Sequence, residues 1–144
     1  MINVDLIELY PIEDSRLLCA VVVARYKEKW VFVRERGKTT WELPGGTHES
    51  GEEISTTASR ELFEETGAKK FTLTPICITS VNVDGRESLG QLFYTEIDEL
   101  GELPSSEIEE VQLFDNIPEN LTYPLIHSLL FSKAVEFCND CKVC

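Results

Sequence analysis

Two apolar runs in the first quarter of the chain are separated by a short polar stretch. Leu17–Arg25 is rich in valine and leucine, and Trp30–Val33 is aromatic and β-branched. Runs of this kind predict β-strands, and the polar interval between them predicts a hairpin. The strands are apolar enough to be buried on both faces. A loop at residues 37–40 and a short strand at Trp41–Leu43 follow, and we expect that strand to end at the proline and two glycines after it.

The middle of the chain has a helical period. Ile54, Ala58 and Leu62 recur four residues apart, which places them on one face of a helix over residues 54–66. Gly67 supplies the end of that helix, because glycine readily adopts the left-handed backbone conformation of a helix C-terminus.

The last part returns to strands and ends in a helix. We predict strands at residues 71–83, 89–97 and 111–114, with Asp84-Gly85 as the turn between the first two. A last helix begins near Pro124, and its apolar stripe faces the sheet. The members of that stripe are Ile126, Leu129, Leu130 and Phe137. This order of elements predicts a mixed α/β or α+β sandwich.

Size and charge limit the partners. The 144 residues carry 26 acidic and 13 basic side chains, a formal charge of −13. A single domain over residues 1–144 suits this length. Binding to duplex nucleic acid is not expected, because phosphate contacts need clustered lysine and arginine. No apolar run reaches the roughly 18–20 residues of a membrane-spanning helix, and no secretory signal is visible, so we expect a cytoplasmic protein without a membrane partner.

Five cysteines divide into two groups. Cys19 and Cys77 lie in apolar runs and are expected to be reduced core residues. Cys138, Cys141 and Cys144 have two successive C-x-x-C spacings, which could in principle bind zinc or an iron–sulfur cluster. Because no fourth ligand is near, we favour a frayed, reduced tail.

Three glutamates crowd one face of the predicted middle helix. Glu61, Glu64 and Glu65 are spaced i, i+3 and i+4, where like charges destabilise a helix by about 0.2–0.5 kcal/mol per pair. They also lie near its C-terminus, where the helix dipole disfavours anions. A hard cation such as Mg²⁺ or Mn²⁺ would offset this repulsion, and carboxylates are ligands that such ions prefer. A solvated acidic helix face is the plainer alternative.

A longer pattern surrounds these glutamates. Gly46 is followed by five residues and Glu52, then by seven residues and the run Arg60-Glu61-Leu62-Phe63-Glu64-Glu65-Thr66-Gly67-Ala68. The pattern resembles, at every specified position, the signature of the Nudix hydrolases, G-x5-E-x7-R-E-U-x-E-E-x-G-U, in which U is aliphatic or small and apolar. Seven fixed positions would match by chance on the order of 10⁻⁸ per starting point. We call residues 46–68 the signature segment.

This resemblance implies an α/β/α sandwich around a mixed sheet, in which the signature segment forms a loop-helix-loop. It also implies metal-dependent hydrolysis of a nucleoside diphosphate linked to another group. The implied ligands of Mg²⁺ or Mn²⁺ are three carboxylates and one backbone carbonyl, those of Glu61, Glu64, Glu65 and Gly45. Arg60 would pair with Glu52 to fix the loop, the alternative being a surface ion pair without effect on activity. Gly46 and Gly67 would permit tight turns.

The general base is less clearly indicated. Members of the family differ, some using a signature glutamate and others a glutamate in a later loop. We favour Glu64 or Glu61 over the later candidates. Those candidates are Glu107, Glu109 and Glu110, for which an acidic loop is the alternative.

Two residues are candidates for substrate contacts beside Gly46. Arg34 lies with Arg36 and Lys38 in the densest basic cluster of the chain, and similar enzymes use basic residues there for phosphate or sugar. Asn120 resembles in position a side chain that some relatives use on a purine edge. A solvated cation and a turn residue are the respective alternatives. We expect Trp41 to be a core or rim aromatic rather than a stacking platform, and both histidines to be structural.

The sequence therefore indicates a pyrophosphohydrolase with a small-molecule nucleotide substrate. The favoured substrate is a nucleoside triphosphate, including oxidised purines of the 8-oxo-dGTP type, with release of the monophosphate. ADP-ribose, sugar nucleotides, dinucleoside polyphosphates and capped RNA ends are alternatives. So are a non-catalytic nucleotide-sensing module and an acidic interaction domain. The oligomeric state stays open, with a homodimer among the options.

Overall fold

The computed structural model describes residues 1–104 and 107–143, with side chains as far as Asp140. The described strands are β1 (Ile2–Ile7), β2 (Cys19–Tyr26), β3 (Lys29–Glu35), β4 (Gly45–Thr47), β5 (Ala68–Val83), β6 (Arg86–Leu100) and β7 (Ile108–Phe114). A 3-10 turn, η1 (Asp14–Arg16), and two α-helices, α1 (Ile54–Thr66) and α2 (Pro124–Val143), complete this part of the chain. None of its helices has the length and hydrophobicity needed to cross a lipid bilayer.

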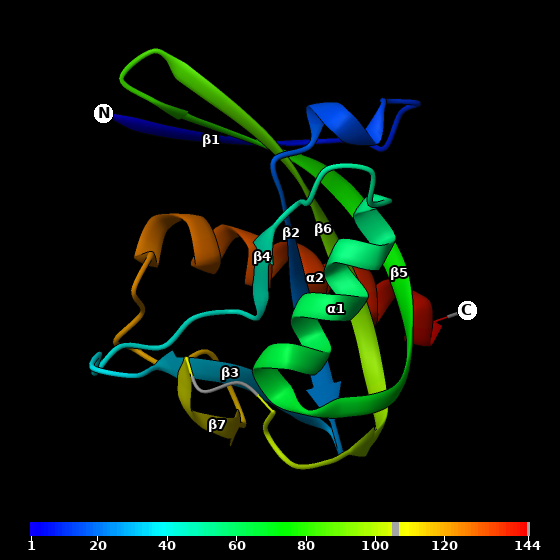
Figure 1. The fold of residues 1–144 in the computed structure, drawn as a ribbon, viewed down its shortest axis with the longest axis vertical. Helices are drawn as coiled ribbons and strands as arrows, with labels where there is room; N and C mark the ends of the chain where they lie inside the picture. The colour runs from blue at the N-terminus through cyan, green and yellow to red at the C-terminus, as the bar shows by residue number, and fades with distance from the viewer. Residues whose placement is uncertain (105–106, 144) are drawn as a thin grey trace.

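The sheet is packed between the two helices, with α1 on one face and α2 on the other (Figure 1). Ala58 and Leu62 of α1 belong to one apolar cluster, and Phe131 of α2 belongs to a second. The central strand β2 feeds both, because Val22 packs under α1 and its neighbour Val23 packs under α2. The predicted burial of this strand on both faces and the predicted α/β/α sandwich are confirmed.

The strand order is β1-β5-β6-β2-β3-β7, with β4 paired to β2 off this path. The sheet is mixed, because β2 runs parallel to β6 whereas its pairings with β3 and β4 are antiparallel. The predicted hairpin of β2 and β3 is present, but only two residue pairs join the strands before they diverge. Beyond that point β4 lies beside the first half of β2, with Gly45 opposite Val21.

The predicted regular strand at Trp41–Leu43, and the break expected at the glycines after it, are wrong. Trp41 and Glu42 form only single bridges, and the regular strand β4 runs through the two glycines instead. A Cβ atom at Gly45 would lie 2.4 Å from the carbonyl oxygen of Ala20. Glycine therefore lets the backbone of β4 approach β2 closely rather than interrupting the strand.

The bounds predicted for α1 are those observed. Its N-terminus is capped from a distance, since Ile54 N–H donates to the Asp14 carboxylate at 3.2 Å. Its C-terminus is closed by Gly67 at φ +82°, whose N–H donates to Phe63 O. Replacement of Gly67 is disfavoured twice, by its left-handed backbone and because a Cβ atom would lie 2.4 Å from Glu102 O.

α2 begins at Pro124 as predicted, and its predicted apolar stripe is confirmed except at Leu129. Leu130 is buried, and Ile126 and Phe137 pack against the cluster under α2. Leu130, Ala134 and Cys138, four residues apart, lie on its buried face, whereas Leu129 is 37% exposed. At 3.6 residues per turn, Leu129 points away from the face that the other three define.

The cysteines depart from expectation at one position. Cys77 is buried as predicted and Cys19 is half-buried, both as free thiols. Cys138 is also a free thiol, but it is buried under α2 rather than frayed, because its sulfur packs against β2 and β6. The side chain of Cys141 and all of Cys144 lie outside the described residues.

The N-terminal strand β1 was not predicted. It pairs antiparallel with the end of β5, from Ile2 opposite Val83 to Ile7 opposite Ile78. The predicted Asp84-Gly85 turn is present, with φ values of 51° and 89°. The strands on either side of this turn are longer than predicted, because β5 begins at Ala68 and β6 ends at Leu100.

Candidate functional site

Arg60 ties α1 to the loop before it. Its Nε lies 2.9 Å from Glu52 Oε2 and its Nη2 donates to Glu52 Oε1 at 3.1 Å, a two-pronged pairing. The same guanidinium donates to Glu61 Oε1 at 2.6 Å and to the Thr47 carbonyl oxygen at 3.2 Å. The predicted pairing of Arg60 with Glu52 is confirmed.

Glu52 is more than a solvated surface partner. Its carboxylate also accepts the Thr57 hydroxyl at 2.6 Å and the Glu49 N–H at 3.3 Å, and its side chain is only 12% exposed. Hydrogen bonds from Arg60 and then from Thr57 lower the pKa of Glu52 to about 2. Glu52 is therefore a fixed anion that holds the loop onto α1.

Glu61 and Glu65 lie against the glycine strand β4. Gly45 N–H donates to Glu65 Oε1 at 3.0 Å, and burial raises the pKa of Glu65 to about 8. A Cβ atom at Gly46 would lie 2.3 Å from the Glu61 carboxyl carbon. Burial also raises the pKa of Glu61, against the opposing effect of Arg60. The expectation of a tight turn at Gly46 is wrong: the residue is extended in β4, and the missing side chain makes room for Glu61.

Glu64 is the most exposed of the three helix glutamates. Its side chain is 47% exposed, and its Oε2 lies 3.6 Å from Arg60 Nη1. Among residues 1–104 and 107–140, no three acidic, histidine or cysteine side chains are grouped as a metal site. Glu61 is turned toward Arg60, and Glu65 toward the Gly45 N–H. The structure thus brings the three glutamates onto one helix face beside β4.

The later glutamates are distinguished by their partners. Glu109 pairs with Arg36, and Glu110 with Arg34 at 3.1 Å. The charge of Glu107, in contrast, contributes to the raised pKa of Glu61, after burial and Glu64. Glu107 is therefore the later glutamate whose charge acts on the signature segment.

Arg34 and Asn120 both donate to backbone carbonyls of the loop after β3. Arg34 donates to the carbonyl oxygen of Lys38 at 3.0 Å, and its guanidinium lies 5.8 Å from the centre of the Trp41 ring. Asn120 Nδ2 donates to the Thr39 carbonyl oxygen at 2.9 Å. Trp41 itself is 9% exposed in the apolar cluster under α2, as expected for a core aromatic.

His127 is a structural histidine, as predicted. Its Nδ1 accepts the Leu43 N–H at 3.2 Å, so α2 holds the segment that leads into β4. Burial lowers the pKa of His127 to about 4. The second histidine, His48, contacts the Glu52 carbonyl oxygen within the loop.

Sequence reasoning missed Glu42. Its Oε2 is buried without a hydrogen-bond partner, and the nearest cation, Lys38 Nζ, is 3.6 Å away. Burial and the charge of Glu35 raise the pKa of Glu42. A charged residue between the apolar Trp41 and Leu43 is the one sequence signal that could have singled it out.

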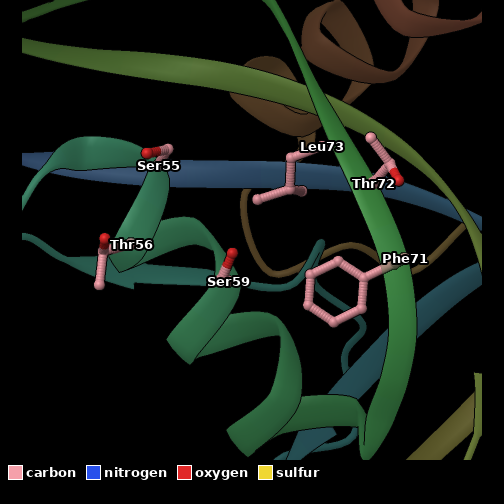
Figure 2. A pocket seen from close by; sticks show the side chains of 6 residues that line it. All are labelled: Ser55, Thr56, Ser59, Phe71, Thr72 and Leu73. Carbon is pink, nitrogen blue, oxygen red and sulfur yellow. The ribbon is translucent and has the colours of Figure 1, made fainter.

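A separate open groove of about 380 Å³ lies between α1 and β5 (Figure 2). It is lined by Ser55, Thr56, Ser59, Phe71, Thr72 and Leu73. None of the residues that the sequence singled out lines this groove, so its location does not coincide with the carboxylate face of α1.

Comparison with known proteins agrees with this geometry. The NUDIX domain model matches residues 15–123. A 36-residue segment is 56% identical to the mouse protein "nucleoside diphosphate-linked moiety X motif 6", covering 25% of this chain but only 12% of the mouse protein.

Solved structures share the fold at low sequence identity. The Bacillus subtilis pyrophosphohydrolase BsRppH superposes with a TM-score of 0.77 at 23% identity, over 92% of this chain and 90% of that one. The NUDIX domain of Shewanella oneidensis NrtR, complexed with ADP ribose, has a TM-score of 0.70 at 19% identity, with 85% and 88% covered. A UDP-X diphosphatase has a TM-score of 0.66 at 22% identity, with 90% and 66% covered.

The family model spans the strands from β2 to β7, α1 and the loop that Arg60 fixes, whereas β1 and α2 lie outside the matched residues. This chain therefore belongs to the NUDIX hydrolase family.

Proposed function

We propose that this chain is a metal-dependent pyrophosphohydrolase that cleaves a nucleoside triphosphate to a nucleoside monophosphate and pyrophosphate. Water adds to a phosphorus of the diphosphate linkage, and the bridging P–O bond breaks. The observation that carries the proposal is the carboxylate face of α1. There Arg60 fixes Glu61 at 2.6 Å, and the Gly45 N–H fixes Glu65 at 3.0 Å.

The residues on this face fit a hard divalent cation. All the candidate donors are oxygen atoms, which suit Mg²⁺ or Mn²⁺. Burial is the main cause of the raised pKa values of Glu61 and Glu65. A cation bound beside them would favour their charged forms. The ion would be held by Glu61, Glu64, Glu65 and the Gly45 carbonyl, and it would neutralise the charge of the phosphates. It would also lower the pKa of a bound water, so that the water could lose a proton and attack phosphorus.

The other roles are positioning of the loop and activation of the water. Arg60 and Glu52 hold the loop and Glu61 in position, because both carboxylates share one guanidinium. Glu64 is the better of the two favoured general bases: it is exposed, whereas Glu61 is engaged by Arg60 at 2.6 Å. Glu107, whose charge acts on Glu61, is the later-loop alternative.

Substrate choice rests on weaker support than the reaction type. Asn120 uses its Nδ2 on Thr39 and offers its Oδ1 as an acceptor for a purine edge. Arg34 would meet a phosphate only by exchanging its carboxylate partner, Glu110. ADP-ribose and UDP-linked compounds, sugar nucleotides among them, are alternatives, because one solved relative is called a UDP-X diphosphatase and another was solved in complex with ADP ribose. A non-catalytic nucleotide-sensing module is the second candidate, and the NrtR domain complexed with ADP ribose shows that this fold can hold such a ligand.

Three sequence-based expectations stay predictions. They are a cytoplasmic location, a single Nudix domain over residues 1–144, and an open oligomeric state that includes a homodimer.

Turnover of a substrate panel tests the proposal. Nucleotide products are separated by chromatography after incubation with canonical and oxidised nucleoside triphosphates, ADP-ribose, UDP-sugars, dinucleoside polyphosphates or capped RNA, with Mg²⁺, Mn²⁺ or a chelator. Chromatography is needed because ADP-ribose and UDP-sugars would yield a nucleoside monophosphate and a sugar phosphate rather than free phosphate or pyrophosphate. We expect metal-dependent pyrophosphate release from a nucleoside triphosphate. Loss of a general base should lower kcat by about 10²–10⁴-fold in Glu64→Gln.

Glu136→Gln is the matched control, because Glu136 is an exposed glutamate on α2 and its substitution makes the same change in charge. Full activity of Glu64→Gln would contradict its assigned role. Absence of turnover together with saturable binding of ADP-ribose would favour the sensing module.

A further inference from the structure

One side chain of α2 holds the segment that leads into β4. His127 Nδ1 accepts the Leu43 N–H at 3.2 Å, and His127 is only 7% exposed. Leu43 is 4% exposed, so its N–H would be buried without a partner if the imidazole were absent. His127 lies beyond residues 15–123, the part of the chain that the family model matches, so the match assigns it no role.

The Leu43 N–H is the last backbone donor before Gly45, because the proline at position 44 has no N–H. The Pro44 carbonyl oxygen accepts the Val22 N–H at 2.9 Å. At this point the segment is therefore held by one hydrogen bond from β2 and one to the His127 side chain of α2.

Gly45 supports two of the four proposed metal ligands. Its own carbonyl is one of them, and its N–H donates at 3.0 Å to the carboxylate of another, Glu65. Because α1 and α2 lie on opposite faces of the sheet (Figure 1), Glu65 and His127 hold this short segment from two sides. A displacement of Gly45 would move both ligands together.

The imidazole of His127 is itself held in place. The Tyr123 ring packs edge-on against it with ring centres 5.4 Å apart, and the His127 N–H donates to the Tyr123 carbonyl oxygen at 2.9 Å. Burial lowers the pKa of His127 to about 4, so the ring is neutral at neutral pH and Nδ1 is a hydrogen-bond acceptor. Leu43 is thus bound to a fixed, uncharged acceptor.

We propose that His127 is a positioning residue for the divalent ion. By accepting the Leu43 N–H, it holds Gly45 where the Gly45 carbonyl and the Glu65 carboxylate can bind one ion. The proposal rests on the metal site of the proposed function. It goes beyond that function because His127 would touch neither the ion nor the substrate, and would act through the backbone from the far face of the sheet. Loss of a contact that orients a metal ligand lowers metal affinity by about 10–100-fold.

The Mn²⁺ affinity of the full chain tests this without any substrate, with free ion followed by electron paramagnetic resonance. His127→Leu removes the acceptor, whereas His127→Asn places an amide oxygen as many bonds from the backbone as Nδ1. We expect Kd to rise by about tenfold or more in His127→Leu and to stay within about threefold of the wild-type value in His127→Asn. An unchanged Kd in His127→Leu, beside a wild type that binds, would overturn the proposal.

Phe131→Leu separates positioning from a general loosening of α2. Phe131 is 6% exposed, lies one turn after His127, and packs its ring against Trp30 and Phe32 of β3. Urea denaturation compares the stability of all the variants. We expect Phe131→Leu to lose stability but to bind Mn²⁺ as the wild type does. Binding weakened as much as in His127→Leu would overturn the proposal.

Failure of the proposed function gives a different result. If the wild type binds no Mn²⁺, the metal site itself is wrong, and the role of His127 falls with it. If His127→Leu does not fold, His127→Gln takes its place with the same two outcomes, because the glutamine amide lies one bond further from the backbone than Nδ1.

Discussion

Arg60 contacts four carboxylates, which determines how the acidic face of α1 is built. Besides its close pairs with Glu52 and Glu61, its Nη1 lies 3.6 Å from Glu64 and 3.8 Å from Glu49. A single cation cannot neutralise four anions. The remaining negative charge is thus available to divalent ions, while the planar guanidinium fixes the geometry of the carboxylates.

We expect Arg60→Lys to reduce activity without unfolding the protein. Lysine keeps the charge but cannot make the two-pronged contact with Glu52 while also reaching Glu61. Loss of such a supporting contact should lower kcat/KM by about 10–100-fold, measured with the best substrate of the panel. Arg86→Lys, at an exposed position on β6, is the control. Full kcat/KM in Arg60→Lys would mean that the pair is only a surface ion pair.

His127 makes stability depend on pH. Its pKa is lowered to about 4 in the folded protein, against about 6.5 in an unfolded chain. Between these values the unfolded state binds more protons, so this contribution is complete above pH about 6.5 and is lost as pH falls toward 4. The loss should amount to roughly 3 kcal/mol.

A two-histidine NMR titration checks this directly, since the chain has only His48 and His127. We expect one imidazole to stay neutral down to pH about 5, and its signal to disappear in His127→Gln. Titration of both rings near pH 6.5 would show that His127 is not buried as described.

At the scale of elements, the strand β4 brings the sheet to the carboxylate face. At its two glycines, a side chain is excluded by different neighbours. A Cβ atom at Gly45 would meet the backbone of Ala20, whereas one at Gly46 would meet the end of the flexible Glu61 side chain. Backbone cannot move as easily as a side chain, so the two positions should respond differently to substitution.

Alanine at each glycine tests this difference. Gly45→Ala should lower the free energy of unfolding by roughly 1–3 kcal/mol, measured by urea denaturation. Gly46→Ala should leave stability near that of the wild type but displace Glu61, lowering kcat by about 10²-fold. Equal stability losses at both positions would mean that Gly46 serves the strand and not the carboxylate.

The elements also show how far sequence could predict this fold. The helix α1 was predicted with its observed bounds, because its period and its terminal Gly67 are local signals. The strand β1 was missed, because its partner β5 lies far along the chain and its side chains are mostly exposed. The strand β4 was missed because it consists mainly of glycine, which normally indicates a break.

The same contrast between local signals and distant contacts applies to the candidate site. The pairing of Arg60 with Glu52 was implied by the resemblance of the signature segment to that of the Nudix hydrolases, and the structure shows it. The buried carboxylate of Glu42 and, outside the site, the burial of Cys138 could not be predicted. Their surroundings come from distant segments, such as Arg25 and Tyr94 around Cys138.

At the scale of the whole molecule, the charge of −13 has to be reconciled with a polyphosphate substrate. The basic side chains near the site do not resolve this, because they already pair with carboxylates. These pairs are Arg34–Glu110, Arg36–Glu109 and Lys38–Glu35. A polyphosphate substrate therefore needs divalent cations between it and the protein.

Titration of Mn²⁺ onto the full chain, with free ion followed by electron paramagnetic resonance, tests this central requirement most directly. It does not depend on knowing the substrate. The account predicts saturable binding by the wild type in the millimolar range or tighter, retained in Glu136→Gln and strongly weakened in Glu64→Gln. Binding that is absent, or equally strong in Glu64→Gln, would contradict the assignment of the α1 glutamates as metal ligands.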